Sequence, residues 1–188
     1  MPLRPGLLRA LGEAAEVLAL TVGAALALKT FVVDAVHVPS ASMEGTILAG
    51  DFLLVNKLVY RGIAPPRRGD VIVVRAPERN VRELYVKRLA ALPGDTLRLR
   101  GGVLFLNGRG VPSPPGAGRG ENAPPDFGPV CVPEDSCFVL GDNLDESLDS
   151  RAWGFVPMRS IVGRAFMVYW SIAPGGGIRW GRLLTMIR

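Results

Sequence analysis

Short apolar runs, each bounded by a turn dipeptide, dominate this chain from residue 51 onward. Gly-Asp stands directly before a run at positions 50–51 and 69–70 and just before another at 94–95, and Asn-Gly at 107–108 closes a fourth. The runs are residues 52–55, 71–74, 97–99, 103–106 and 138–140. Runs of this length with such turns are typical of antiparallel sheets. We therefore predict a mainly β fold, and the absence of a G-x-G-x-x-G or P-loop pattern gives no support to a nucleotide-binding fold.

The N-terminal region has a different character. Residues 17–28 form a run of twelve uncharged and mostly apolar residues, followed by Lys29. A helix over residues 11–33 would be about 34 Å long, enough for a bilayer core of about 30 Å. We predict a cytoplasmic tail (1–12), one transmembrane anchor (13–34) and an extracytoplasmic domain (35–188).

Two other interpretations of this segment remain open. One is a cleaved signal peptide, because Ala25-Leu26-Ala27 fits a small-x-small cleavage site. The other is a buried core helix. Both the anchor and the signal peptide would place the rest of the chain outside the cytosol, and Arg4 and Arg9 before the span favour a cytoplasmic N-terminus.

Charge and residue counts exclude several kinds of site. The formal net charge of +5 is compatible with nucleic acid or an anionic membrane and identifies neither, and we expect no nucleic-acid partner. One histidine and two cysteines cannot form a zinc site of several histidines, so we predict no metal and no other cofactor. Arginine cannot act as a general base, which leaves Lys29, Lys57 and Lys87 for any lysine chemistry.

A serine and a lysine are the remaining means of nucleophilic catalysis. Ser40 and Ser42 lie two residues apart and share one face of an extended segment. Lys87 lies in an apolar stretch that reads as a strand, where burial would favour its neutral amine. A serine-rich turn and an exposed strand lysine are the alternatives that spacing alone leaves open, and we expect His37 to be structural.

Four segments, in order, resemble the type I signal peptidases, the bacterial leader peptidases. Residues 39–46, followed by Gly-Asp at 50–51, resemble the serine box of that family. Residues 68–74 resemble the next box, and residues 85–95 resemble the lysine box. Residues 141–154 resemble the final box. Together with the apolar N-terminus, the resemblance covers nearly the whole chain.

The resemblance implies an antiparallel β catalytic domain with a short inserted subdomain at about residues 96–130. It implies a membrane-bound, monomeric serine endopeptidase that removes signal peptides from exported preproteins without a cofactor. Ser42 would be the nucleophile and Lys87 the general base, while Ser40 and the Ser42 backbone N–H would form the oxyanion hole. The supporting residues would be Ser147, Asp149 and Arg151, and the substrate pockets would be lined by Val36, Val38, Tyr85 and Val86.

The chain departs from the family pattern at three positions that are not catalytic. Gly45 stands where the family usually has proline, Leu144 where it has arginine, and Glu146 where it has asparagine. Two other functions stay open: a dedicated Ser–Lys processing peptidase with a narrow substrate set, and a non-catalytic β module tethered to a membrane.

The two cysteines are close enough in sequence to form a disulfide bond. Residues 133–136 between Cys131 and Cys137 could form a turn, and an external compartment would permit oxidation. We predict a dispensable Cys131–Cys137 disulfide, with two unpaired thiols as the alternative.

Overall fold

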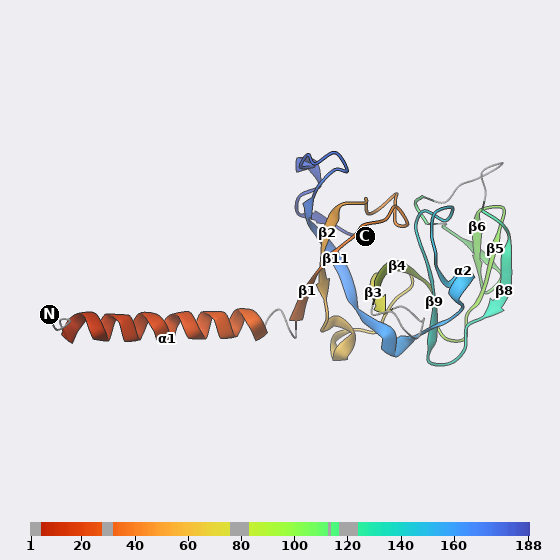
Figure 1. Cartoon of the computed structure of the whole chain (residues 1–188). Helices are drawn as coiled ribbons and strands as arrows, with labels where there is room; N and C mark the ends of the chain where they lie inside the picture. Colours follow the sequence, from red (N-terminus) through yellow and green to blue (C-terminus); the bar gives the residue numbers. More distant parts are fainter. Residues whose placement is uncertain (1–4, 28–31, 76–82, 113, 117–123) are drawn as a thin grey trace.

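The computed structural model describes residues 5–27, 32–75, 83–112, 114–116 and 124–188. Parts of the expected anchor and insertion, Lys29 among them, lie outside the described residues. Helix α1 (Pro5–Ala27) extends away from a β domain (Figure 1). Among the helices within the described ranges, none has the combination of length and apolar character needed to cross a bilayer.

The β domain contains two antiparallel sheets, which confirms the prediction of a mainly β antiparallel fold. The larger sheet has the order β1-β2-β11-β3-β4-β9-β10, with β12 paired to β11. Its strands are β1 (Val33–His37), β2 (Asp51–Asn56), β3 (Val71–Arg75), β4 (Leu84–Ala91), β9 (Ser136–Leu140), β10 (Val156–Pro157), β11 (Ile161–Ser171) and β12 (Thr185–Met186). The smaller sheet has the order β7-β6-β5-β8, with β5 (Thr96–Arg100), β6 (Val103–Leu106), β7 (Arg109–Val111) and β8 (Phe127–Cys131).

Short helical segments occupy the connections. They are η2 (Val59–Ile63), α2 (Ser150–Trp153), η4 (Met158–Ser160) and η5 (Trp180–Arg182). The smaller sheet lies at the end of the domain far from α1 (Figure 1).

The apolar runs become strands because each buries its side chains against a neighbouring layer. Strand β3 lies between β11 and β4, and four successive residues from Val71 to Val74 are buried, as expected for an internal strand covered on both faces. Strand β5 alternates between exposed and buried residues, as expected for a strand with one solvated face. Phe138 on β9 joins a core cluster with Leu97 and Leu99 on β5, and this cluster connects the two sheets.

The three Gly-Asp dipeptides before strands form one recurring turn. Their glycines have φ values of +89°, +89° and +81°, which favours glycine at the third position of a type II turn. The carboxylates of Asp51, Asp70 and Asp95 each accept a hydrogen bond of 2.9 Å from the backbone N–H three residues earlier. Each carboxylate also forms an ion pair, with Arg182, Arg164 and Arg68 respectively. The dipeptide is therefore both a turn and an anchor for a distant arginine.

The predicted disulfide is wrong, because both cysteines are free. Cys131 is exposed on β8 and pairs with Thr96 in the smaller sheet. Cys137 lies on β9 in the larger sheet, fully buried, and its thiol donates to the Val156 carbonyl at 3.4 Å. Burial raises the pKa of the Cys137 thiol to about 12, so it behaves as a small core residue.

Candidate active site

Ser42 lies in a compact turn that follows β1. The turn is held by backbone hydrogen bonds from Glu44 to Ala41 and from Ile47 to Met43, and both Met43 and Ile47 are fully buried. Burial of these two apolar side chains fixes the turn to the core, and Ser42 itself is 7% exposed. The turn therefore holds a serine hydroxyl at the edge of the hydrophobic interior.

The glycine at position 45 is explained by the shape of this turn. Gly45 has a φ of +106°, which proline cannot adopt. A Cβ atom at position 45 would lie 2.8 Å from the Gly116 backbone nitrogen, and one on Gly116 would lie 2.3 Å from the Glu44 carbonyl oxygen. The segment 114–116 thus packs its backbone directly on the serine turn, and both glycines are required for that approach.

Ser40 accompanies Ser42. The two hydroxyl oxygens are 3.3 Å apart, and either could donate. The pair of hydroxyls predicted from the spacing is therefore present on one face of the segment.

Lys87 is a buried lysine on β4. Its side chain is among the largest that are fully buried, with 2% of the residue exposed, and its amine donates to Ser147 Oγ at 3.1 Å. Burial lowers the pKa of Lys87 from 10.5 to about 8; the positive charge of Arg151 adds to this, whereas the Asp149 and Asp142 carboxylates oppose it. About one tenth of such a lysine is neutral at pH 7 and about half at pH 8.

Gly141 brings the lysine and the serine segments together. A Cβ atom on Gly141 would lie 2.2 Å from Ser147 Oγ and 2.3 Å from the Ser42 carbonyl oxygen. The Asn143 backbone N–H also donates to that Ser42 carbonyl at 3.2 Å. The Ser147 hydroxyl, which binds Lys87, and the Ser42 carbonyl therefore both pack directly against Gly141. Only glycine fits between them, because any side chain at position 141 would clash with both.

The loop from residue 141 to 151 is held by an ion pair. Asp149 is fully buried and accepts hydrogen bonds from the Gly141 backbone N–H at 3.0 Å and from Arg151 Nε at 2.9 Å. Arg151 also donates to the carbonyls of Leu144 and Ser147. Because the same guanidinium contacts the carboxylate and the carbonyl of Ser147, it fixes the position of the hydroxyl that orients Lys87.

Leu144, which stands where the family usually has arginine, is explained by its packing in the core. Leu144 is 2% exposed and belongs to the core cluster that joins the two sheets. A leucine here replaces charge with packing, and its backbone carbonyl still accepts from Arg151. Glu146 is exposed.

Arg88 and Asp142 are structural residues that the sequence reasoning missed. Arg88 binds the fully buried Asp142 carboxylate through two hydrogen bonds of 2.6 Å. The same guanidinium donates to Thr46 Oγ1 at 2.9 Å and to the Gly69 carbonyl at 2.7 Å. One arginine thus joins the serine turn, the strand of Lys87 and the loop of Ser147. The sequence signal that could have identified Arg88 is its position directly after Lys87, in the segment that resembles the lysine box.

A cavity of about 440 Å³ opens beside the serine. Val38, Tyr85 and Val86 line it together with Ser40 and Ser42. The cavity is also lined by His37, Pro39, Glu83 and Leu84. Val36 is not among the lining residues of this cavity, and it packs against the core cluster that contains Val38 and Val86.

Aromatic contacts shape the walls of this cavity. Tyr85 packs against Trp153 with ring centroids 4.8 Å apart, and its hydroxyl donates to Glu83 Oε2 at 3.1 Å. His37 lies 4.6 Å from the ring of Phe52 and is exposed.

Segments of two strands, β1 and β4, lie beside the cavity. Strand β1 is the first strand of the larger sheet and pairs only with β2 among the described strands. On β4, the register with β3 covers residues 84–88, and the register with β9 begins at Arg88. An extended peptide can add to the edge of a sheet through main-chain hydrogen bonds.

Within the described ranges, no group of histidine, cysteine and carboxylate residues is arranged to hold a metal ion.

Comparison with known proteins identifies relatives over most of this chain. The family model "Signal peptidase, peptidase S26" matches residues 11–170. Signal peptidase I of Leptolyngbya laminosa is 39% identical over 171 residues, covering 85% of this chain and 80% of the relative. Signal peptidase I of Bacillus licheniformis is 36% identical over 153 residues, covering 77% and 81% respectively. The crystal structure of a signal peptidase I from Enterococcus faecalis has 33% identity and a TM-score of 0.47, and the match covers 54% of this chain and 97% of that chain.

Proposed function

We propose, on the premise that this chain belongs to the signal peptidase family (peptidase S26), that Ser42 is its nucleophile and Lys87 its general base. Members of this family remove signal peptides, and the chain is accordingly a serine endopeptidase that acts on the signal peptides of preproteins. The observation that carries the residue assignment is the buried Lys87 amine, which is held by Ser147 and has a pKa lowered by burial.

The reaction follows from the chemistry of these two groups. Neutral Lys87 accepts the Ser42 hydroxyl proton as Ser42 Oγ attacks the carbonyl carbon of the scissile peptide bond. The tetrahedral oxyanion then collapses, the C–N bond breaks, and the Lys87 ammonium returns the proton to the leaving amine. Lys87 next takes a proton from water, whose oxygen attacks the carbonyl carbon of the acyl-enzyme ester. The ester C–O bond then breaks, Lys87 returns the proton to Ser42 Oγ, and the signal peptide leaves with a free carboxyl group.

Two donors are assigned to the oxyanion. These are the Ser42 backbone N–H and the Ser40 hydroxyl, which lies 3.3 Å from Ser42 Oγ. Donors aimed at the position of the developing charge stabilise the tetrahedral intermediate more than the bound substrate. Asp149 and Arg151 act through Ser147, because they fix the loop that carries its hydroxyl.

The substrate is assigned to the edge strand β1 and to residues 84–87 of β4, beside the 440 Å³ cavity. Main-chain hydrogen bonds to β1 and to residues 84–87 would supply affinity, while the shallow space between Val38, Tyr85 and Val86 would admit side chains the size of alanine. Small residues near the cleaved bond are thus the expected preference.

Membrane attachment through α1 is also part of this proposal. Exposed apolar side chains cover the described helix, and these are Val17, Leu18, Leu20, Val22 and Leu26. The anchor is proposed to begin at about residue 13 and to end before β1, which starts at Val33 and pairs with β2. Residues 1–12 would lie in the cytoplasm, and the domain from β1 onward would lie outside as a monomer. The proposed insertion, at about residues 96–130, would include the smaller sheet.

The orientation is tested with protease added to spheroplasts. External protease should digest the catalytic domain in intact spheroplasts, while an epitope placed before residue 12 should need lysis to become accessible. A protected domain would reverse the orientation, and a mature chain that begins near residue 28 would favour a cleaved signal peptide.

The activity is tested with the detergent-solubilised full chain and a preprotein. We expect one new N-terminus by mass spectrometry, directly after a small-x-small sequence, and no product with Ser42→Ala. A panel of unrelated preproteins separates a general signal peptidase from a dedicated processing enzyme, which would cleave only one of them. Cleavage by Ser42→Ala at the wild-type rate would contradict the nucleophile assignment.

A further inference from the structure

A second cavity, separate from Ser42, opens at one end of the larger sheet. It has a volume of about 630 Å³, and four cations and one carboxylate line it. The cations are Lys57, Arg61, Arg75 and Arg159, and the carboxylate is Asp34. Lys57 and Asp34 form an ion pair at 3.7 Å, so three arginines give the basic cavity a local charge of about +3.

These three arginines differ from the other arginines near the core. Arg88, Arg151 and Arg182 each hold a buried carboxylate. Arg61, Arg75 and Arg159 are exposed and form no ion pair with any residue in the described ranges. Unpaired guanidinium groups that surround a cavity are free to bind an external anion, and their planar geometry suits phosphate oxygens.

The arginines come from three distant segments that the fold brings to one place. Arg61 lies in η2, Arg75 ends β3, and Arg159 lies in η4 just before β11. The strand register aligns these positions: Val33 on β1 and Arg164 on β11 both pair with Asn56, and Ile161 on β11 pairs with Val74. The start of β1, the end of β2, the start of β11 and the end of β3 therefore share one end of the sheet.

This end of the sheet is also where the chain arrives from α1. Six residue steps separate Ala27, the last residue of α1, from Val33, the first of β1, a span of at most about 20 Å when fully extended. Two exposed apolar side chains belong to the same segments: Leu84, which is 42% exposed and lines the cavity, and Ile63, which is 72% exposed and follows Arg61 in η2. Cations and apolar side chains together suit the interface of a bilayer.

We propose that the basic cavity binds the phosphate of an anionic phospholipid headgroup at the surface of the membrane to which α1 attaches. The proposal rests on that membrane attachment and is independent of the Ser42–Lys87 chemistry. Anionic lipids attract basic segments close to a membrane helix, and this cavity adds geometry to that attraction. Leu84 lines both this cavity and the one beside Ser42, so a bound lipid would hold the substrate groove close to the bilayer surface.

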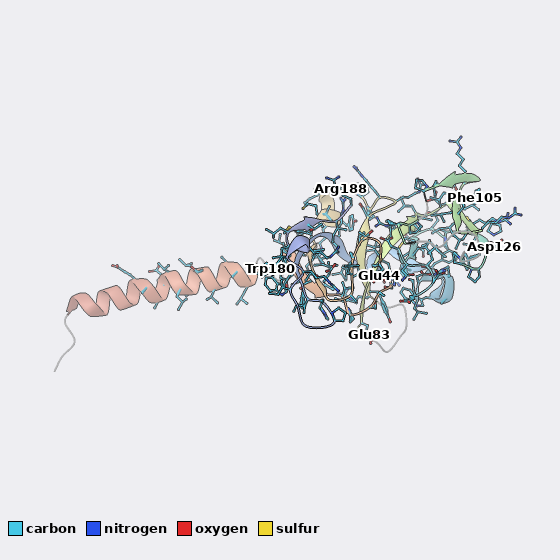
Figure 2. All side chains as sticks on the ribbon, turned by 90° about the horizontal axis from the view of Figure 1, so that it is seen from above. Glu44, Glu83, Phe105, Asp126, Trp180 and Arg188 are labelled. Carbon is cyan, nitrogen blue, oxygen red and sulfur yellow. The ribbon has the colours of Figure 1, made fainter. Side chains whose placement is uncertain are left out.

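The test compares two triple variants of the full chain in neutral detergent micelles. Arg61→Gln, Arg75→Gln and Arg159→Gln together remove the unpaired charges of the cavity. Arg98→Gln, Arg100→Gln and Arg109→Gln remove the same net charge from exposed positions of the smaller sheet. That sheet lies far from α1 in Figure 1, and Figure 2 places Phe105 of the same sheet far from α1 as well.

The probes are short-chain phosphatidylglycerol, short-chain phosphatidylcholine and glycerol phosphate, each titrated by calorimetry. We expect the wild-type chain and the control variant to bind phosphatidylglycerol with the same affinity. The cavity variant should bind it about 100-fold more weakly, at about fivefold for each of the three arginines. Thermal unfolding of both variants checks that the fold is intact.

Several outcomes would overturn the proposal. Equal losses in the two variants would mean that binding depends on overall charge, and equal affinity for phosphatidylcholine would mean that it does not depend on the anion. Glycerol phosphate that binds as tightly as phosphatidylglycerol would identify a site for free phosphate instead of lipid. If the cavity variant bound phosphatidylglycerol with unchanged affinity, the three arginines could not be the binding site.

The result is separable from the proposed function. Preprotein cleavage in micelles without anionic lipid should be equal for the wild type and both triple variants, and Ser42→Ala should bind phosphatidylglycerol like the wild type. Flotation with neutral phosphatidylcholine vesicles reports attachment through α1 alone. Cleavage, attachment and headgroup binding are thus three readouts, each of which can fail while the others persist.

Discussion

Two adjacent cations on β4 have opposite environments. Lys87 is buried with a hydroxyl as its hydrogen-bond partner, and burial lowers its pKa to about 8. Arg88, on the other face of the strand, holds a buried carboxylate through two short hydrogen bonds. A buried lysine without a direct counter-ion can lose its proton, whereas a paired arginine stays charged and holds segments together. The strand therefore places the proposed chemistry on one face and structural support on the other.

Replacing the lysine by a cation that cannot lose its proton should have the largest effect. Lys87→Arg keeps the positive charge and removes the base, so we expect kcat/KM to fall more than about 10³-fold. Lys57→Arg is the matched control, because Lys57 follows β2, which β11 and β3 separate from β4, and forms an ion pair with Asp34. Near-normal cleavage by Lys87→Arg would refute the base assignment.

Removing the arginine on the other face should reduce stability. Arg88→Met leaves the fully buried Asp142 carboxylate without its partner, and we expect a loss of about 3–5 kcal/mol in the free energy of unfolding. Arg88→Met combined with Asp142→Leu should recover much of this loss, because no uncompensated charge remains. Denaturant titration of the full chain in micelles measures both, and an equally unstable double variant would argue against the ion pair as the cause.

The pH dependence of cleavage sharpens the comparison further. The proposed active form has a neutral Lys87, so the rate should be full above the pKa of about 8 and should fall as pH drops through it. Below that pKa, kcat/KM should decrease about tenfold per pH unit. The measurement uses a substrate with no titrating group near the cleaved bond, and a flat profile between pH 9 and pH 6 would point to another base.

The cysteines should have the smallest effect. Cys131→Ser changes an exposed thiol that forms no disulfide, and the midpoint of thermal unfolding and the cleavage rate should be nearly unchanged, within about 0.5 kcal/mol in stability. Adding a reductant to the wild-type chain should also leave the midpoint unchanged. A reductant-sensitive midpoint would contradict the free thiols.

The sequence alone determined the class of fold and the residues to consider for chemistry. Turn dipeptides between short apolar runs predict antiparallel strands because both signals are local: glycine and asparagine favour turns, and alternating or fully buried apolar residues favour strands. The small number of lysines and the single histidine likewise limited the possible bases. Family resemblance then selected Ser42 and Lys87 from the remaining candidates.

Only the tertiary structure decided which residues meet. The burial that lowers the Lys87 pKa comes from packing between strands far apart in the chain, and its Ser147 partner lies 60 residues away. The link from Arg88 to Asp142 and Thr46 depends on the same long-range assembly. The failed disulfide has the same cause: Cys131 and Cys137 are close in sequence, but strand pairing assigns them to different sheets. Local sequence signals specify turns and strands. Which side chains are buried, which ions pair and whether two cysteines meet depends on how strands distant in the sequence pack together.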